Sequence, residues 1–142
     1  MKRNFILLVS VVMAIAAFWA AQASASGAPV VISYGKTCDA GLHCVGTAGS
    51  GGTIEMQVSL PTYRATGDAA QLTLTEWITV GSVSFTAEMS GHMSPAGFIV
   101  LNGTVTEGSF AGARVHQRSD LVGIEGTSTK WCGQLQILPA TA

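Results

Sequence analysis

Charged residues are scarce in this sequence: Asp, Glu, Lys and Arg together make up 11% of its 142 residues. Seven Lys and Arg stand against eight Asp and Glu, so the formal net charge is −1. Two of the basic residues belong to an N-terminal leader; five basic and eight acidic residues remain without it, which gives −3. A weakly acidic chain is not electrostatically attracted to nucleic acid or anionic lipid, so we expect neither as a partner.

Long apolar runs are also missing, with one exception at the start of the chain. Lys2 and Arg3 precede the apolar stretch Phe5–Ala21, which is followed by small residues that include Ala23 and Ala25. A basic segment, an apolar segment and a small-residue cleavage region in this order define a secretory signal peptide. We predict cleavage after Ala23 or Ala25.

This interpretation sets the domain organisation and the compartment. We assign residues 1–25 to the signal peptide and residues 26–142 to a single β domain. The protein is then secreted or periplasmic. Because no second apolar segment of spanning length follows, we expect no membrane attachment after cleavage.

Helical periodicity is absent from the rest of the chain, where apolar and polar residues alternate instead. Alternation with period two, together with many Thr and Val, is typical of β-strands. Strands are predicted over residues 30–34, 54–60, 72–80, 82–89, 98–106, 111–118, 121–125 and 131–137. The connecting segments 38–52, 62–70 and 90–97 are rich in glycine or polar residues and are predicted as loops.

About eight short strands without crossover helices favour an all-β fold. We therefore predict a single small antiparallel β-barrel or a barrel-like sandwich. The segment Gly108-Ser109-Phe110-Ala111-Gly112-Ala113 resembles a turn that begins a strand in dirigent-like and allene-oxide-cyclase-like barrels. That resemblance covers six residues and implies a barrel.

Cysteines are few and odd in number: Cys38, Cys44 and Cys132. In an oxidising compartment two of them should pair. Cys38 with Cys44 would close a short loop, whereas a bond to Cys132 would join the two ends of the domain. The sequence slightly favours the short loop and leaves both open. The remaining thiol is free or forms a disulfide-linked dimer.

Two groups of side chains are candidate sites for metals or ions. Met89, His92 and Met93 combine thioether and imidazole donors, which suit Cu(I), and this loop resembles the Met/His sites of small periplasmic copper carriers. Arg114, His116 and Arg118 share one face of a predicted strand. They form a solvated outer face in one strand register, and a ligand site inside the barrel in the reversed register.

Trp77 is a third candidate, because it lies among threonines on the polar face of its predicted strand. An aromatic ring among hydroxyl groups can stack on a sugar, although a tryptophan more often packs inside a domain.

Catalytic motifs are lacking. The acidic residues are scattered singly, and the three histidines fall in separate segments, so the sequence leans away from an enzyme and predicts no cofactor. We expect a binding or interaction module for a small molecule, a glycan or a protein. Two alternatives stay open: a periplasmic copper protein that uses the Met89/His92/Met93 loop, and a small β-barrel enzyme that uses Arg114, His116 and Arg118.

Overall fold

The computed structural model describes residues 28–139, so the predicted signal peptide lies outside the described residues. Eight strands follow one another along the chain: β1 (Val30–Cys38), β2 (His43–Ala48), β3 (Thr53–Thr66), β4 (Ala69–Val80), β5 (Val83–Met93), β6 (Phe98–Gly108), β7 (Arg114–Glu125) and β8 (Ser128–Leu138). Each strand pairs antiparallel with the next, and β1 pairs with β8. The prediction of an all-β antiparallel barrel or barrel-like sandwich is confirmed, and the structure is the closed barrel.

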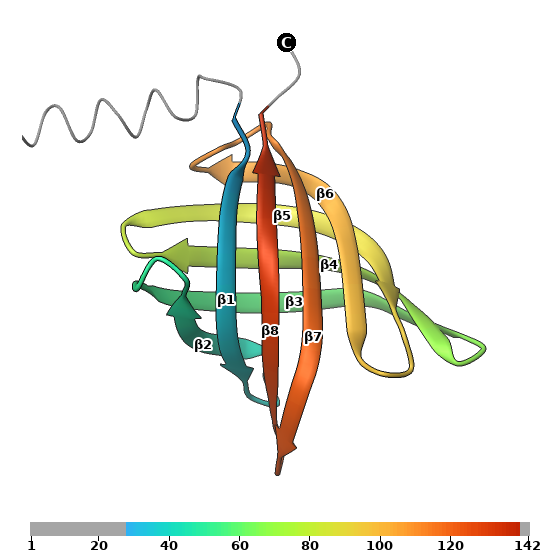
Figure 1. Ribbon diagram of the computed structural model, residues 1–142. Helices are drawn as coiled ribbons and strands as arrows, with labels where there is room; N and C mark the ends of the chain where they lie inside the picture. The colour runs from blue at the N-terminus through green and yellow to red at the C-terminus, as the bar shows by residue number, and fades with distance from the viewer. Residues whose placement is uncertain (1–27, 140–142) are drawn as a thin grey trace, which may run out of the picture.

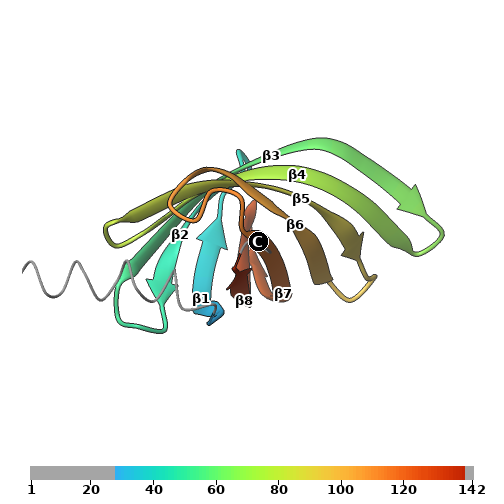
Figure 2. The same cartoon turned by 90° about the horizontal axis from the view of Figure 1, so that it is seen from above.

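The barrel is flattened into two layers whose strands cross. In Figure 1, β1, β8 and β7 run vertically, and β3, β4 and β5 run across them behind. Figure 2 shows β3 to β6 arching over β1, β8 and β7. Crossed layers of this kind enclose an interior between two inner faces. The β3–β4 hairpin extends beyond the rest of the barrel (Figure 1), and the last residues of β3 are all exposed.

Three predicted loops proved to be partly strand. The segment Cys38–Gly52 contains β2, which pairs with both β1 and β3. Strand β2 carries Gly46 where an inward apolar residue would stand, so its alternation is too weak to recognise in the sequence. In the same way, β3 and β4 leave only a two-residue turn within Thr62–Ala70, and β5 continues to Met93 inside the predicted loop 90–97.

One strand was divided in the prediction. Residues 111–118 and 121–125 were assigned to two strands, but β7 is continuous, with a register irregularity against β8 between Leu121 and Gly123. Glycine and a bulge interrupt the alternation without ending the strand. The prediction omitted β2 and counted β7 as two strands. These two errors cancel, so the predicted number of strands, eight, equals the observed number.

The interior has two halves of different character. The half near the β2–β3, β4–β5 and β6–β7 turns is filled by buried apolar side chains and is called the apolar half. Its main members are Ile54, Ile78, Phe85, Ala87, Val105, Val115, Leu135 and Ile137. Phe85 and Phe110 pack edge to face there, with ring centroids 5.7 Å apart. The half near the four other turns contains a cavity and is called the cavity half.

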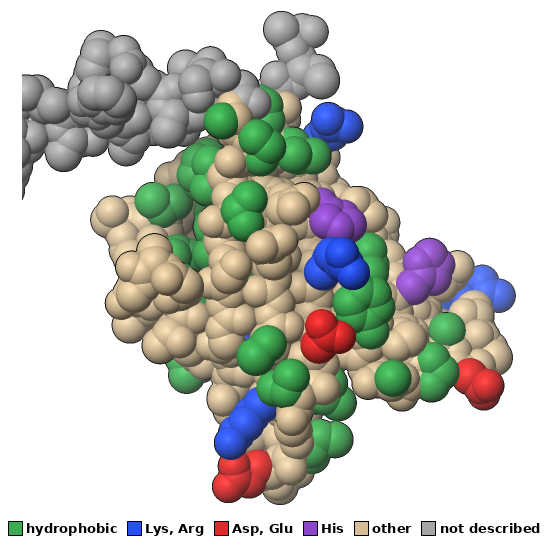
Figure 3. All heavy atoms as spheres, in the orientation of Figure 1, with side chains coloured by type: hydrophobic (Ala, Val, Ile, Leu, Met, Phe, Trp, Pro, Cys, Tyr) green, Lys and Arg blue, Asp and Glu red, His purple; other side chains and the backbone are tan. Residues whose placement is uncertain are grey.

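Charged side chains are sparse on the face that Figure 3 shows, where tan surface, which marks backbone and other uncharged side chains, predominates over β1 and β8. The charged side chains of β7, among them Arg114, Arg118 and Asp120, are exposed. No helix long and apolar enough to cross a membrane occurs among residues 28–139.

Candidate functional site: a cavity with a buried polar cluster

The cavity half encloses a space of about 200 Å³ that reaches the surface at the end of the barrel. Its wall is mainly apolar: Val58, Leu60, Leu72, Leu74, Ile99 and Leu101. Leu42, Tyr63 and Trp131 lie at its mouth, where Leu42 and Tyr63 are 37% and 57% exposed. Trp131 is fixed by its indole N–H, which donates to Thr129 Oγ1 at 2.8 Å.

A disulfide forms part of the cavity wall. Cys38 and Cys44 are paired residues of β1 and β2, both are buried, and they form the bond that the sequence favoured. The bond closes the β1–β2 hairpin, whose Leu42 adopts a left-handed backbone with φ of 60°. Leu42 accepts a backbone hydrogen bond from Val58 N at 3.0 Å. The hairpin is thereby tied to β3 at the mouth.

Five polar side chains lie at the inner end of the cavity or just below it: Tyr34, Lys36, Glu76, Gln117 and Ser119. We call them the polar cluster. They come from β1, β4 and β7, at positions where strand alternation turns every second side chain inward. All five are at most 8% exposed.

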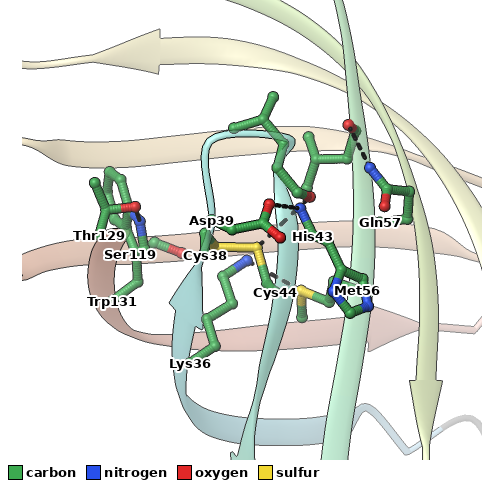
Figure 4. Close-up of a disulfide and its surroundings, with 12 residues drawn as sticks. Lys36, Cys38, Asp39, His43, Cys44, Met56, Gln57, Ser119, Thr129 and Trp131 are labelled. Atoms are coloured by element: carbon green, nitrogen blue, oxygen red, sulfur yellow. Dashed lines mark hydrogen bonds between the residues drawn. A yellow bond between two sulfur atoms is a disulfide. The ribbon is translucent and has the colours of Figure 1, made fainter. Parts of the chain in front are cut away.

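Lys36 extends from β1 toward Met56 of β3, as Figure 4 shows. Its Nζ donates to Met56 Sδ at 3.0 Å and lies 5.1 Å from the centre of the Tyr34 ring. A thioether is a weak acceptor and cannot replace the water that surrounds an ammonium ion. Burial lowers the pKa of Lys36, and the nearby Glu76 carboxylate opposes this shift.

Glu76 stands on β4, two residues from Leu74 and Ile78, and is 2% exposed. Burial raises the pKa of its carboxyl group, while the Lys36 charge and the Gln117 side chain oppose the shift. Among the described residues, Glu76 Oε2 and Gln117 Oε1 have no hydrogen-bond partner. Buried acceptors without partners are rare and costly, so they indicate a place for an additional donor.

The rest of the polar cluster is fixed by direct hydrogen bonds. Gln117 Nε2 donates to Tyr34 Oη at 2.7 Å, and the Tyr34 and Ser119 hydroxyls are hydrogen bonded. Gly133 of β8 pairs with both Tyr34 and Ser119. A Cβ atom there would lie 2.6 Å from Tyr34 Oη and 2.8 Å from Ser119 Oγ. Because glycine has no Cβ atom, Gly133 leaves space for the hydrogen bond between the Tyr34 and Ser119 hydroxyl groups.

The basic group predicted on β7 lies on the outside of the barrel. Arg114 and Arg118 are exposed and His116 is half-buried, whereas Val115, Gln117 and Ser119 point inward. His116 Nδ1 is 2.7 Å from Asn102 Oδ1, and the Arg118 guanidinium lies 5.3 Å from the centre of the Phe98 ring. The reversed register that would have turned these residues inward is wrong, since the inward positions of β7 are occupied by their neighbours.

The predicted copper loop is not assembled as a site. Met89 is 2% exposed in the core, and Met93 lies on the cavity wall. His92 lies between them in the alternation of β5 and is exposed, so its side chain is on the other face.

Two further predicted residues lie on the outer surface. Trp77 is 47% exposed, and its neighbours across the strands are Gln57 and Thr86. Cys132 is exposed on β8 and forms no disulfide within the part of the chain that the structure describes. A disulfide between two copies through Cys132 stays a prediction.

The sequence analysis did not identify the polar cluster. Its signature was present, because Glu76 shares the parity of Leu72, Leu74 and Ile78, and a charge on an apolar face is unusual. Lys36 was harder to recognise, since the first strand was predicted to end at Tyr34. It lies two residues beyond, on the same face.

Comparisons with protein-family models, curated proteins and solved structures found no match for this chain.

Proposed function

We propose that this protein binds one small, mainly apolar molecule inside the cavity half of the barrel. The observation that carries the proposal is an apolar cavity whose inner end holds two buried acceptors without partners, Glu76 Oε2 and Gln117 Oε1. Eight-stranded barrels are wide enough to hold one small ligand. An apolar wall with a few polar groups at one end is the usual construction of such a site.

The volume limits the size of the molecule. Cavities of about 150 Å³ hold benzene, so a space of about 200 Å³ suits a ligand of one or two fused rings or a short chain. The two acceptors without partners favour a hydroxyl group at the inner end of this ligand, and the Lys36 amine can donate to a carbonyl group there. The exposed Tyr63 and the left-handed turn at Leu42 border the entrance.

Binding of 2-naphthol, measured by isothermal titration calorimetry, tests this function. We expect saturable binding at one site per chain, which Leu60→Trp in the cavity wall weakens by about tenfold or more, since about 1.4 kcal/mol of lost contact is tenfold in affinity. Trp77→Ala, on the outer face, is the matched control and should leave affinity unchanged. Loss of binding in Trp77→Ala with normal binding in Leu60→Trp would place the site on the outside and overturn the proposal.

We also propose that the protein acts outside the cytoplasm, in the extracellular medium or the periplasm. The leader pattern of residues 1–25 and the Cys38–Cys44 bond support this, because disulfides persist in oxidising compartments. Expression of the full chain in a secreting host should yield a protein that begins at Ser24 or Ser26. N-terminal sequencing that finds an intact Met1 in the cell interior would contradict export.

A further inference from the structure

The two lysines of the described chain stand in opposite environments. Lys130 lies on the surface, with its Nζ 3.2 Å from Glu125 Oε2. Lys36 is 8% exposed, borders the cavity, and has no carboxylate oxygen within 4.0 Å among residues 28–139. Its hydrogen-bond partner is the sulfur of Met56. One lysine is thus a solvated cation, and the other is an amine held in an apolar enclosure.

An unpaired ammonium ion is costly to bury, so such a group loses its proton instead. The neutral amine of lysine is a nucleophile, and desolvation in an apolar pocket is one of the ways in which proteins activate it. Glu76 lies on the same cavity wall, and burial raises the pKa of its carboxyl group, which favours the protonated form. The cavity therefore combines an amine that can attack with a carboxyl group that can give a proton.

We propose that Lys36 forms an imine with an aldehyde or ketone group of the molecule bound in the cavity. This rests on the proposed function and adds the chemical class of the ligand. A carboxylate ligand would require Lys36 to be charged and would lie beside Glu76. An aldehyde or ketone group is uncharged, so it requires no charge on Lys36 and brings no second negative charge beside Glu76. The apolar wall contacts the rest of the molecule.

The chemistry balances without an oxidant or a reductant. The Lys36 Nζ lone pair forms a bond to the carbonyl carbon, and the oxygen takes a proton from Glu76. The nitrogen returns one of its protons to the Glu76 carboxylate, which gives a carbinolamine. Glu76 then protonates the hydroxyl group, water leaves, and the nitrogen lone pair completes the C=N bond. The last proton lost from nitrogen restores Glu76, so amine and carbonyl become imine and water.

Reductive trapping tests this inference. The protein is incubated at pH 7 with 2-naphthaldehyde and sodium cyanoborohydride, which converts an imine into a stable amine, and peptide mass spectrometry locates the naphthylmethyl group. We expect faster modification at Lys36 than at Lys130, because the cavity holds the aldehyde beside the Lys36 amine and burial lowers the pKa of Lys36. Lys130→Arg should retain the trapping and Lys36→Met should abolish it, with circular dichroism confirming that both variants are folded.

Two further variants separate a reactive site from an exposed amine. Leu60→Trp keeps Lys36 and fills part of the cavity from its wall, so it should slow trapping in proportion to the loss of 2-naphthol binding. Glu76→Gln should slow trapping by a larger factor than it weakens 2-naphthol binding, since it removes the proton donor and preserves the shape of the side chain.

The outcomes distinguish the two proposals. If 2-naphthol binds but the aldehyde modifies Lys130 or the N-terminal amine as fast as Lys36, the imine site is wrong and the binding function stands. If 2-naphthol does not bind and no trapping occurs at Lys36, both are wrong.

Discussion

The apolar half and the cavity half of this barrel are built from the same strands but filled by different rules. In the apolar half, Ile54, Ile78 and Leu135 meet at 1% exposure or less. In the cavity half, the same inward faces carry Lys36, Glu76 and Gln117 around a space of about 200 Å³. The apolar half therefore stabilises the fold. The cavity half stabilises it less, because its interior is partly unfilled and contains buried ionisable groups.

The contrast between the filled apolar half and the partly empty cavity half indicates where a chain without catalytic motifs carries its function. Dispersion and the hydrophobic effect reward a filled interior, so an unfilled half with buried ionisable groups needs another reason. A ligand supplies that reason, because it fills the space and offers partners to acceptors that otherwise have none. The following variants test the contrast between the two halves.

The largest effect is expected in the apolar half. Leu135→Ala should lower the free energy of unfolding by about 2–5 kcal/mol, because closely packed neighbours cannot collapse into the space left behind. Leu74→Ala, which enlarges an existing cavity, should cost clearly less. Denaturant unfolding measures both, with the exposed Val31→Ala as the control. Equal losses for Leu135→Ala and Leu74→Ala would remove the distinction between the halves.

The next effect has the opposite sign. The double variant Lys36→Met/Glu76→Gln removes two buried ionisable groups that have no salt-bridge partner among residues 28–139, and burying such groups costs free energy on folding. We expect a higher free energy of unfolding at pH 7 together with loss of carbonyl trapping. A less stable double variant would show that this pair maintains the fold rather than a ligand site.

Removal of the disulfide should cost about 2 kcal/mol, the chain-entropy value for the short loop that it closes. Cys38→Ala/Cys44→Ala is the variant, and thermal unfolding is the measurement. Because the bond lies in the cavity wall, 2-naphthol affinity should fall as well. Cys132→Ala, on the outside, is the control. If it changed stability as much as the double variant, Cys132 would have an unrecognised structural role.

The smallest effect is a pH dependence that comes from Glu76, which shares the polar cluster with the titratable groups Lys36 and Tyr34. Burial raises the pKa of Glu76 in the folded state above its ordinary value of 4.5. The folded protein then binds this proton more tightly than the unfolded chain does. The stability that Glu76 contributes is fully present below pH 4.5 and is lost as the pH rises through the folded pKa.

Relative to Glu76→Gln, the wild-type protein should therefore lose stability as the pH rises from 4.5 to neutrality. Lys36 acts in the opposite direction, because its lowered pKa makes stability rise with pH toward 10.5. Lys36 is present in both the wild-type protein and Glu76→Gln, so the difference between their stability curves gives the contribution of Glu76. Parallel stability curves for wild type and Glu76→Gln would mean that the carboxyl group titrates alike in both states.

The fold class was accessible from the sequence because period-two alternation is strong in β3, β4, β5 and β8. Trp131, Leu135 and Ile137 share the inner face of β8, as their spacing predicted. Strand β2 was not accessible, since its inward positions include a cysteine and a glycine instead of large apolar residues. It becomes a strand because β1 and β3 both pair with it, which is a tertiary effect.

The candidate site was less accessible than the fold. Alternation alone places Glu76 on the inner face of β4, and a stricter use of parity would have identified it. No local pattern shows that Glu76 and Lys36, which are 40 positions apart, border the same cavity. That information depends on the closure of the barrel. The residues that attracted attention in the sequence, such as His92 and Arg118, lie on the outer face.

Methyl NMR spectroscopy during a titration with 2-naphthol observes both halves of the barrel at once and shows which of them holds the ligand. We expect shifts of the methyl signals of Leu72, Leu74, Ile99 and Leu101, which line the cavity, while those of Ile54, Ile78 and Leu135 remain in place. Shifts confined to the apolar half, or to residues around Trp77 on the outer face, would show that the ligand does not occupy the cavity.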